Sequence, residues 1–433
     1  MKAAVYDSFA PSPITVRTVP IPSLSQNEHQ PKQKQQSSSS SQQSLLEANG
    51  VILQVMATGV CRSDWHGWKG HDTDIQNHGL PFVPGHELSG IIVEVGYDVH
   101  NFRVGDRVAV PFILSCGHCC ECHRGRATVC ESQEQPGFTT WGGFAEYVAL
   151  PRADRNLRLL PSNVSFVEAA ALGCRFATAY RAVMQRGGLD EYLTSPSVIA
   201  MNKASISSPT SSHSDHPSFS ISIAVFGCGG LGLACIMIAH TLLKRLNKMG
   251  LVTQIIAIDI SSQALEKAKE IGATHTVLCP KTTTQNNHND DGNYNQKQQQ
   301  QVRENVIKLT NHNQGADITI DAAGFSSTCE NAVWSTRRGG KMVQVGLPMG
   351  GRPPIIPMDV VAGREIDISG SHGFDAQDLP HLLDLVADGT LNVKDLIERE
   401  VTLEEGAQAI MDMETSSPLG MTIVTKFDSS SRL

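Results

Sequence analysis

The sequence predicts an α/β protein that combines a doubly wound parallel sheet domain with a mostly antiparallel β domain. Two observations predict this division. Up to about residue 150, short strands are parted by Gly and Pro, which is typical of an antiparallel module. Beyond residue 220, apolar strands alternate with helical stretches, which is the pattern of a doubly wound sheet.

Five short runs predict the strands of the antiparallel module. They cover residues 14–19, 51–56, 89–95, 107–110 and 144–150. A helical stretch is then expected from Phe166 through Ala182, because the apolar period changes there.

The remaining elements alternate in type. The run 221–226 is apolar apart from Ser222, as expected of a parallel strand that is buried on both faces. Further strands are expected at 254–258, 275–278, 317–320, 341–345 and 421–427, and helices at 231–246, 262–271, 302–309, 327–337, 376–388 and 403–413. We therefore expect one domain from residues 1–178 and 369–433, and a second from residues 179–368.

Three stretches of low complexity interrupt this pattern, at about residues 26–44, 194–220 and 282–301. They are rich in polar residues such as Gln, Ser, Asn and His, and they offer no apolar face that could be buried. We expect all three to be disordered surface insertions.

Composition argues against several classes of function. The chain has 433 residues, a net charge of −8 and a pI near 6.0, which disfavours a nucleic-acid or anionic-membrane partner. It contains no run of about 18 apolar residues that could span a membrane. Eleven cysteines in a chain of this size favour metal binding in a reducing compartment over a disulfide scaffold. A strand begins directly at Met1 without a signal peptide, so we expect a cytoplasmic protein.

The end of the sequence carries a second clue about location. Ser431-Arg432-Leu433 resembles a three-residue peroxisomal address, with Arg in place of the commoner Lys. An ordinary frayed terminus is the alternative. The sequence leaves both interpretations open.

A cysteine-rich run lies in the antiparallel module. Cys116, Cys119, Cys122 and Cys130 have the spacing C-x2-C-x2-C-x7-C, in which four thiolates can converge on one tetrahedral ion. Four cysteine ligands leave no position open for a substrate, so the sequence predicts a structural zinc site in a lobe of about residues 112–135. Cys120 has no place in this set.

A glycine loop joins the first parallel strand to its helix. Gly227, Gly229, Gly230 and Gly232 lie between a buried strand and a helix, the context that a dinucleotide fingerprint requires. Asp259 ends the next strand, where a carboxylate accepts hydrogen bonds from a ribose 2′-OH and repels a 2′-phosphate. The loop therefore predicts NAD as the cofactor.

Cys61, His86 and Cys174 form a second candidate set of metal ligands. Alone, each is more often a buried thiol or a hydrogen-bonded core histidine. Together, two thiolates and one imidazole are a ligand set that leaves zinc one open position for a substrate. The three residues therefore predict a catalytic zinc site.

The order of these motifs resembles the zinc-dependent medium-chain alcohol dehydrogenase family. The resemblance rests on Gly-His-Glu at residues 85–87 after Cys-x-x-Asp at 61–64, on the four-cysteine lobe and on the glycine loop. It covers nearly the whole chain apart from the three polar insertions. It implies a GroES-like catalytic domain made from both chain ends around a Rossmann domain. It also implies two zinc ions per subunit, NAD and a small-molecule alcohol or aldehyde substrate, and we expect a homodimer or homotetramer.

The resemblance also implies roles for individual residues. Ser63 matches the hydroxyl that bonds the substrate alcohol, and His66 matches the outer end of a proton relay. Asp64 and Glu87 match carboxylates that orient and tune the catalytic zinc. The implied contacts to the cofactor are Arg62, Thr178, Leu231 and Val345, and Phe112 and Phe138 are candidates for the substrate channel.

A mechanism follows from this resemblance. Zinc lowers the pKa of the alcohol, the proton leaves to solvent through Ser63, the cofactor ribose and His66, and hydride passes to NAD. The reverse reaction reduces an aldehyde or ketone.

Two positions depart from the family pattern. Arg175 follows Cys174 where many relatives have a small residue, and Gly420-Met421 stands where many relatives place a phosphate-binding Arg or Lys. Two bulky residues near the site, Trp65 and Trp68, either narrow the pocket or pack beside the lobe.

Two alternative functions remain open. The first is a polyol or sugar-alcohol dehydrogenase, and Cys174 as the third ligand leans against it because polyol relatives often use a carboxylate. The second is a catalytically silent zinc- and dinucleotide-binding regulatory protein. The complete set of ligand and relay residues argues against that second alternative.

Overall fold

The protein forms two compact units, and each is described by itself. The structure, a computed structural model, describes residues 1–24, 46–195, 220–247, 252–280, 291–347 and 353–427. The first unit comprises Met1–Ala177 and Gly373–Leu433, and the second comprises Thr178–His372. The predicted insertions at 26–44 and 194–220 lie almost wholly outside the described residues, as does the C-terminal tripeptide at 431–433.

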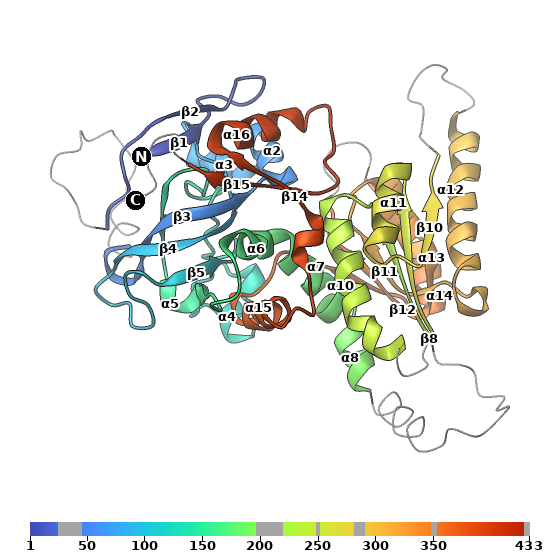
Figure 1. Ribbon diagram of the computed structural model, residues 1–433. Coiled ribbons are helices and arrows are strands. Elements are labelled where there is room, and N and C mark those ends of the chain that lie inside the picture. Colours follow the sequence, from blue (N-terminus) through green and yellow to red (C-terminus); the bar gives the residue numbers. More distant parts are fainter. Residues whose placement is uncertain (25–45, 196–219, 248–251, 281–290, 348–352, 428–433) are drawn as a thin grey trace. The chain divides into compact units, whose positions relative to one another are not determined.

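A mostly antiparallel sheet of seven strands dominates the first unit (Figure 1). Its path is β14-β15-β3-β4-β5-β7, and β6 pairs with β3. All of these pairs are antiparallel except β14 with β15. Two further strands, β1 and β2, form a separate antiparallel pair. The strands are β1 Lys2–Val5, β2 Thr15–Thr18, β3 Val51–Gly59, β4 Glu87–Val95, β5 Arg107–Val110, β6 Tyr147–Leu150, β7 Arg158–Leu159, β14 Ile397–Thr402 and β15 Met421–Lys426.

The core of this sheet follows from the period of two in its strands. Val51, Leu53 and Val55 of β3 are alternate residues, and they pack into one core with Leu88 and Ile92 of β4. Short helices surround the sheet. They are α2 Arg62–Trp68, α3 Thr73–His78, α4 Cys120–His123, η1 Ala127–Val129, α5 Ala153–Asn156, α6 Phe166–Ala171, η5 Ala376–Asp378, α15 Leu379–Ala387, η6 Val393–Leu396 and α16 Leu403–Asp412.

The helical stretch that the sequence predicts from Phe166 is irregular. Ser165 and Glu168 form a capping box that starts α6. After α6 come a π-helical turn η2 (Leu172–Phe176), α7 (Ala177–Arg181) and a second π-helical turn η3 (Ala182–Arg186). A single π-helical turn inserts a residue into the i+4 ladder, and such turns are frequent at functional sites.

The second unit is a parallel sheet of six strands in the order β10-β9-β8-β11-β12-β13. Numbered along the chain, this order is 3-2-1-4-5-6, which is the doubly wound dinucleotide-binding arrangement. The predicted fold class is therefore confirmed. The strands are β8 Ser220–Phe226, β9 Val252–Asp259, β10 His275–Leu278, β11 Ala316–Asp321, β12 Thr336–Gln344 and β13 Asp367–Gly370.

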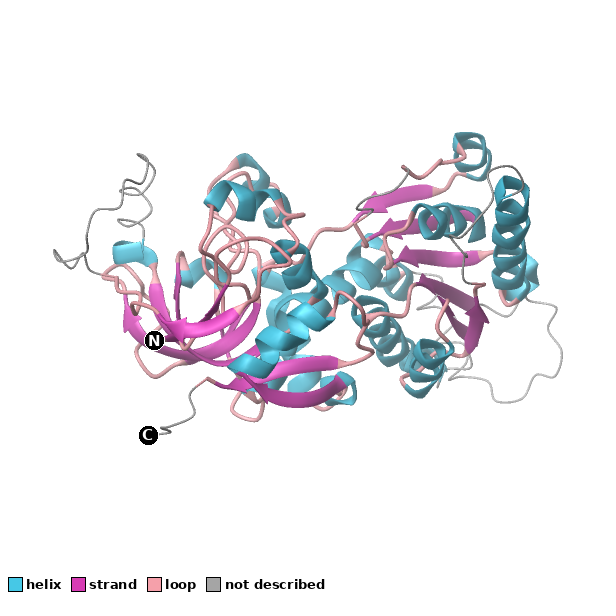
Figure 2. Cartoon of the chain, turned by 90° about the horizontal axis from the view of Figure 1, so that it is seen from above, coloured by secondary structure: helices cyan, strands magenta, loops and turns pink. Residues whose placement is uncertain are grey.

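Helices cover both faces of this parallel sheet (Figure 2). One face carries α10 and α11, which contact each other, and the other carries α12 and α13 (Figure 1). The helices of the unit are α8 Leu189–Thr194, α10 Gly230–Asn247, α11 Ser262–Glu270, α12 Asp291–Lys308, η4 Asn311–Asn313, α13 Ser326–Ser335 and α14 Met358–Arg364.

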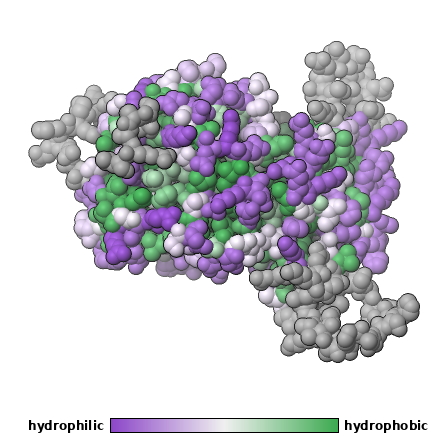
Figure 3. Space-filling model, viewed as in Figure 1, coloured by the Kyte–Doolittle hydropathy of each residue, from purple (hydrophilic) through white to green (hydrophobic). Residues whose placement is uncertain are grey.

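One expectation needs a correction. The polar stretch 282–301 is predicted to be disordered, whereas α12 already begins at Asp291 and so includes the second half of it. Gln and Lys are good helix formers, and side-chain hydrogen bonds from Gln300 to Glu304 and from Gln301 to Asn305 connect residues four apart. Hydrophilic residues gather over the edge where α12 lies (Figure 3).

The part of α12 that follows the polar stretch packs into the apolar core of the second unit. Val302 and Val306, four residues apart, are buried in the core of the second unit. Among the described residues, no helix is both long enough and apolar enough to cross a membrane.

Candidate metal centres and glycine loop

Four cysteine sulfurs converge in the lobe between β5 and β6. The Cys116 and Cys122 sulfurs are 3.9 Å apart, and those of Cys119 and Cys130 are 3.8 Å apart. A tetrahedral site with Zn–S bonds of about 2.3 Å has S–S edges of about 3.8 Å. The four thiols therefore fit one zinc ion.

Backbone groups support the same cluster. The amide of Cys119 donates to the Cys116 sulfur, and the amide of Cys116 donates to the Cys130 sulfur, both at 3.3 Å. A hydrogen bond from the backbone of Cys122 lowers the pKa of Cys119 to about 6, whereas burial raises the pKa of Cys130 to about 12. Because the thiols cannot all ionise easily side by side, a bound cation is needed to hold four thiolates together.

The second cluster brings together residues from three separate parts of the first unit. Cys61 is the N-cap residue of α2, His86 directly precedes β4, and Cys174 lies in the π-helical turn η2. Their ligand atoms and a carboxylate oxygen of Glu87 all lie within 4.8 Å of one another. The three residues that the sequence predicts as catalytic-zinc ligands are therefore neighbours in the structure.

Asp64 organises this second cluster. One carboxylate oxygen, Oδ1, lies 3.0 Å from His86 Nδ1 and accepts a hydrogen bond from the Gly85 amide at 3.0 Å. The other oxygen, Oδ2, accepts from the Cys61 amide at 2.9 Å. Gly85 has φ of +107°, a backbone conformation that favours glycine. Asp64 therefore fixes the backbone of Cys61 and the ring of His86.

His86 is left with one ring nitrogen for a ligand. Its Nε2 is completely buried and has no hydrogen-bond partner among the described residues. A buried polar atom without a partner is costly unless an ion or water binds it. An imidazole that is hydrogen-bonded to a carboxylate through Nδ1 and free at Nε2 is the arrangement found at metal-binding histidines.

The charges of the cluster also call for a cation. A hydrogen bond from the Cys174 thiol lowers the pKa of Cys61 well below its ordinary value, and the same contact raises the pKa of Cys174. Burial raises the pKa of the Glu87 carboxyl to about 7. Two thiols and the Glu87 carboxyl in one buried space can ionise together only when positive charge is present. A divalent zinc ion fits this donor set.

Arg175 supplies part of that positive charge. Its guanidinium is buried, with Nε 3.8 Å from Glu87 Oε1 and Nη2 donating to the Val60 carbonyl at 3.1 Å. Its backbone amide donates to the same Glu87 oxygen at 3.1 Å. The residue that departs from the family pattern is thus part of the cluster, a role that the sequence did not predict.

Aromatic side chains border the His86 ring. The ring of Phe138 lies 4.8 Å from that of His86, and the ring of Phe112 lies 6.0 Å from it. Both phenylalanines are buried. The two candidates for the substrate channel therefore lie beside the predicted catalytic ligands.

The two residues predicted as a proton relay, Ser63 and His66, follow Cys61 on α2. The Ser63 hydroxyl lies 3.8 Å from the Cys61 sulfur. His66 lies one turn further along α2, and its Nδ1 lies 3.1 Å from Nδ1 of His71. The His71 contact is another feature that the sequence analysis missed, and the only available signal was a second histidine five residues after His66.

Arg62 and the two tryptophans of α2 have defined contacts within the first unit. The Arg62 guanidinium lies over the Trp65 ring at 3.8 Å and donates to the Met413 carbonyl at 2.5 Å. Trp68 is buried in the core, and its indole N–H donates to the Ser12 carbonyl at 2.6 Å. Of the two roles considered for Trp68, packing therefore applies.

The glycine loop lies in the second unit between β8 and α10. Gly227 has φ of +92°, and a Cβ atom at Gly232 would lie only 1.7 Å from the Gly227 carbonyl oxygen. Glycine is therefore required at both positions for the tight turn. Asp259 ends β9, and its carboxylate accepts hydrogen bonds from the amides of Cys228 at 2.6 Å and Ser261 at 2.8 Å. The acid and the loop are thus directly connected.

The other predicted cofactor residues are in the second unit, whereas Arg62 is in the first. Leu231 lies in the first turn of α10, Val345 directly follows β12, and Thr178 lies in α7 with a buried hydroxyl that has no hydrogen-bond partner among the described residues.

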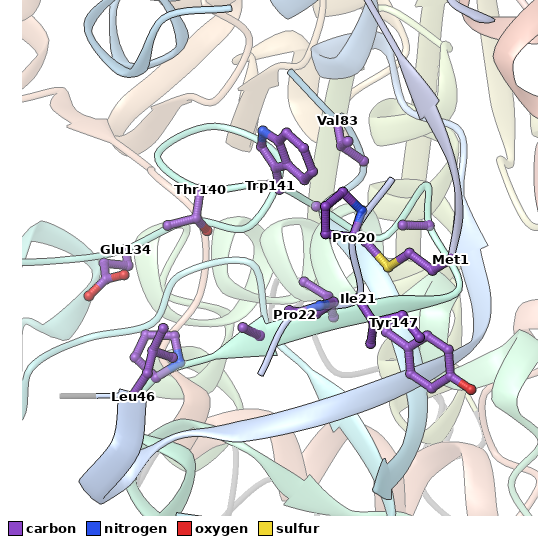
Figure 4. A pocket seen from close by; sticks show the side chains of 15 residues that line it. Met1, Pro20, Ile21, Pro22, Leu46, Val83, Glu134, Thr140, Trp141 and Tyr147 are labelled. Carbon is purple, nitrogen blue, oxygen red and sulfur yellow. The ribbon is translucent and has the colours of Figure 1, made fainter. Parts of the chain in front are cut away.

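A separate apolar pocket of about 320 Å³ lies in the first unit near the N-terminus (Figure 4). Trp141, Tyr147 and Ile21 are among its lining residues. No residue of either metal cluster lines it. This pocket is therefore not the candidate active site.

Two family models match the chain. The model described as "Alcohol dehydrogenase GroES-like domain" matches residues 47–161, and the model described as "Zinc-binding dehydrogenase" matches residues 230–388. The first covers Cys61 and His86, which are predicted as catalytic-zinc ligands, and the four-cysteine lobe. The second begins within the glycine loop.

Curated relatives match over almost the whole chain. An alcohol dehydrogenase of Geobacillus stearothermophilus is 30% identical over 431 residues, which are 99% of this chain and 100% of the relative. A sorbitol dehydrogenase of Bacillus subtilis is 28% identical and covers 95% of this chain and 92% of its own length.

Solved structures share the fold. A structure described as an NAD-dependent alcohol dehydrogenase has a TM-score of 0.71 and 25% sequence identity, covering 99% of this chain and 100% of its own. An alcohol dehydrogenase of Thermus sp. ATN1 has a TM-score of 0.73 at 23% identity, with coverage of 99% and 100%.

Proposed function

The chain belongs to the zinc-dependent medium-chain alcohol dehydrogenase family, and from this premise we propose that it reversibly oxidises an alcohol to an aldehyde or ketone with NAD. One observation supports this most strongly. Cys61, His86 and Cys174 converge in a buried cluster in which His86 Nε2 has no other partner among the described residues. When bound, zinc would supply Lewis-acid polarisation of the substrate hydroxyl, and NAD would accept the hydride.

The chain's own residues hold the site in order. Asp64 fixes the His86 ring and the Cys61 backbone, so both ligands are oriented before any metal arrives. Ser63 is adjacent to Cys61, where its hydroxyl can accept the proton of the substrate alcohol. His66, on the same helix, would carry this proton onward. Phe112 and Phe138 present apolar surface beside His86 and exclude water from the reacting groups.

Each subunit would bind two zinc ions. The first would be held by Cys61, His86 and Cys174, and the second by the four cysteines of the lobe, whose sulfur separations match a tetrahedral zinc site. Four thiolates leave no ligand position for a substrate, so the role of the lobe zinc is structural.

NAD is the proposed cofactor, in preference to NADP. Asp259 ends β9, beside the glycine loop, and its two oxygens are held by backbone amides. A fixed carboxylate at this position accepts the ribose hydroxyls and repels a 2′-phosphate. An Asp259→Ser variant should have a lower kcat/KM for NAD than the wild type. Its ratio of kcat/KM for NADP to kcat/KM for NAD should be higher than that of the wild type.

A polyol substrate is the second candidate. Sorbitol dehydrogenase of Bacillus subtilis and D-xylulose reductase A of Aspergillus oryzae are among the relatives, each at 28% identity. The buried carboxylate of Glu87 beside the thiols is compatible with this chemistry.

Homodimers or homotetramers are the assemblies that we propose for the active enzyme.

Zinc analysis and a substrate panel test this proposal together. Zinc-loaded protein would be incubated with NAD or NADP and with primary, secondary and polyhydroxy alcohols, and reduced cofactor would be followed by absorbance. We expect two zinc ions per chain and turnover with NAD. Turnover confined to sorbitol and other polyols would favour the second candidate. No turnover by zinc-loaded protein over the whole panel would favour a silent binding protein.

A further inference from the structure

His66 is paired with a second histidine that has no role in the function proposed above. The two Nδ1 atoms are 3.1 Å apart, and the ring centroids are 5.4 Å apart. His66 is half-buried on α2, and His71 is exposed. Two nitrogens at this distance share one hydrogen, because one must donate and the other must accept.

The backbone between these residues fixes the position of His71. Gly70, just beyond the end of α2 at Trp68, has φ of +72° and donates its amide to the Gly67 carbonyl. The amide of His71 donates to the His66 carbonyl at 3.0 Å. The next residue, Asp72, is the N-cap of α3 and accepts from two amides of that helix. His71 therefore lies between two capped helix ends.

Aromatic and charged side chains enclose the pair on one side. The Trp65 ring packs edge-on against both imidazoles, at 4.7 Å from His66 and 5.7 Å from His71. Arg62 stacks on Trp65, whose indole N–H donates to Glu414. Lys69 forms an ion pair with Glu414 at 3.0 Å. Trp65, which packs against the two imidazole rings, is therefore fixed in place by its contacts with Arg62 and Glu414.

We propose that His71 is a second proton carrier, which receives the proton of the substrate alcohol from His66 and passes it to solvent. This inference rests on the proposed function. One proton enters at His66 Nε2, and the shared hydrogen moves from His66 Nδ1 to His71 Nδ1. His71 is then positively charged and releases one proton to water or buffer, so charge and proton number balance.

The environment of His66 explains why a second carrier is useful. Burial is the main cause that lowers the pKa of His66 to about 4, and the positive charges of Arg62 and of protonated His71 lower it further, whereas a Cys61 thiolate opposes this shift. Such an imidazole holds a proton poorly at neutral pH. A proton that reaches it therefore needs an acceptor that contacts solvent, and His71 is the exposed imidazole within hydrogen-bond distance.

The kinetic test compares His71→Ala and His71→Asn with the wild-type enzyme on an alcohol that the panel has identified. We expect kcat/KM for oxidation to fall roughly tenfold in weak buffer, less than the loss of a primary acid–base catalyst. Added imidazole should restore the rate of His71→Ala. The variant His66→Ala should lose more activity, and adding His71→Ala to it should cost nothing further, because the second carrier acts only through the first.

His100 provides a control for the His71 variants. His100 is also exposed, in a different loop, beside Asp98, so His100→Ala should leave the rate and its buffer dependence unchanged. A His71→Ala enzyme with wild-type kcat/KM at every pH and buffer concentration would overturn the proposal. So would a loss of activity that imidazole does not restore, since that outcome indicates a structural role.

A measurement without turnover separates this inference from the proposed function. In zinc-loaded protein with 15N-labelled histidine, the pair should show one protonated and one unprotonated Nδ1 at neutral pH. In His71→Asn, the signal of the His66 ring should shift. Two unprotonated Nδ1 atoms would overturn the pairing even in an active enzyme.

Discussion

Nδ1 of His86 lies 3.0 Å from Oδ1 of Asp64, and both side chains are completely buried. Burying this pair is favourable only if each polar atom is satisfied. The second oxygen of Asp64 is occupied by the Cys61 amide, so Nε2 of His86 is the atom that remains without a partner among the described residues. The carboxylate therefore orients the imidazole as the proposed role of His86 as a metal ligand requires.

Changing Asp64 to Asn should weaken zinc binding at the catalytic cluster. An amide keeps the size of the side chain but removes the charge that stabilises the imidazole, and loss of such a partner typically costs about 10- to 100-fold in metal affinity or activity. Competition with a chromogenic chelator measures this affinity. An Asp98→Asn variant, changed at an exposed carboxylate, should be unaffected. Unaltered zinc affinity in Asp64→Asn would contradict the role assigned here.

Replacing Arg175 with Met should destabilise the first unit. The change leaves the buried Glu87 carboxyl without its cationic neighbour, and breaking a buried ion pair in this way costs about 3 kcal/mol or more. Urea unfolding of the zinc-loaded protein would measure the loss. The double variant Arg175→Met with Glu87→Gln should recover part of it, because the two changes are coupled. Additive losses would show that the pair does not interact.

Changing Cys130 to Ser should remove one zinc ion per chain and leave the catalytic zinc in place. If free zinc is about a hundredfold above the dissociation constant, the lost binding lowers the free energy of unfolding by about 3 kcal/mol. Cys120 is the matched control, since it is exposed in the same lobe. A Cys120→Ser variant should keep two zinc ions and wild-type stability. Equal losses in the two variants would argue against the four-cysteine assignment.

The pH dependence of stability should report on His66. Burial lowers the pKa of this imidazole to about 4 in the folded state, against about 6.5 for an unperturbed histidine. Between these values the unfolded chain binds more protons, so the contribution of His66 to the free energy of unfolding is complete above pH 6.5 and is lost as the pH falls toward 4. His66→Asn should therefore show a shallower decline over this range in denaturant titrations. An unchanged slope would contradict the shifted pKa.

Much of the fold could be predicted because strongly periodic segments leave little choice. The run 221–226 is apolar apart from Ser222, and its partners form the parallel sheet with boundaries close to those expected. The helices α2 and α3 were not predicted, because seven and six residues are too few for a clear period and Gly67 lies inside α2. The π-helical turn that carries Cys174 also leaves no mark in the sequence pattern.

The candidate site also contains residues that the sequence predicted and residues that it did not. Motif spacing predicted a set of metal ligands, Cys61, His86 and Cys174, whose ligand atoms are neighbours in the structure, because these residues are chemically distinctive and stand in a recognisable order. Spacing could not show that Arg175 turns inward to Glu87, or that His71 returns to His66. The Arg175 contact depends on the path of the backbone in η2, and the His71 contact depends on the turn that follows α2. Neither composition nor period specifies these two backbone conformations. Tertiary structure supplied these two residues.

Zinc content and alcohol-dependent reduction of NAD, measured side by side for wild-type protein and a Cys174→Ala variant, test the central claim most directly. Cys235→Ala serves as the control, because this thiol is buried on α10 outside both clusters. We predict two zinc ions and turnover for the wild type and the control. Cys174→Ala should lose the catalytic zinc and about a thousandfold of the activity, since Lewis-acid polarisation contributes several kcal/mol and about 1.4 kcal/mol corresponds to a tenfold change in rate. A Cys174→Ala protein with two zinc ions and full activity would contradict the account.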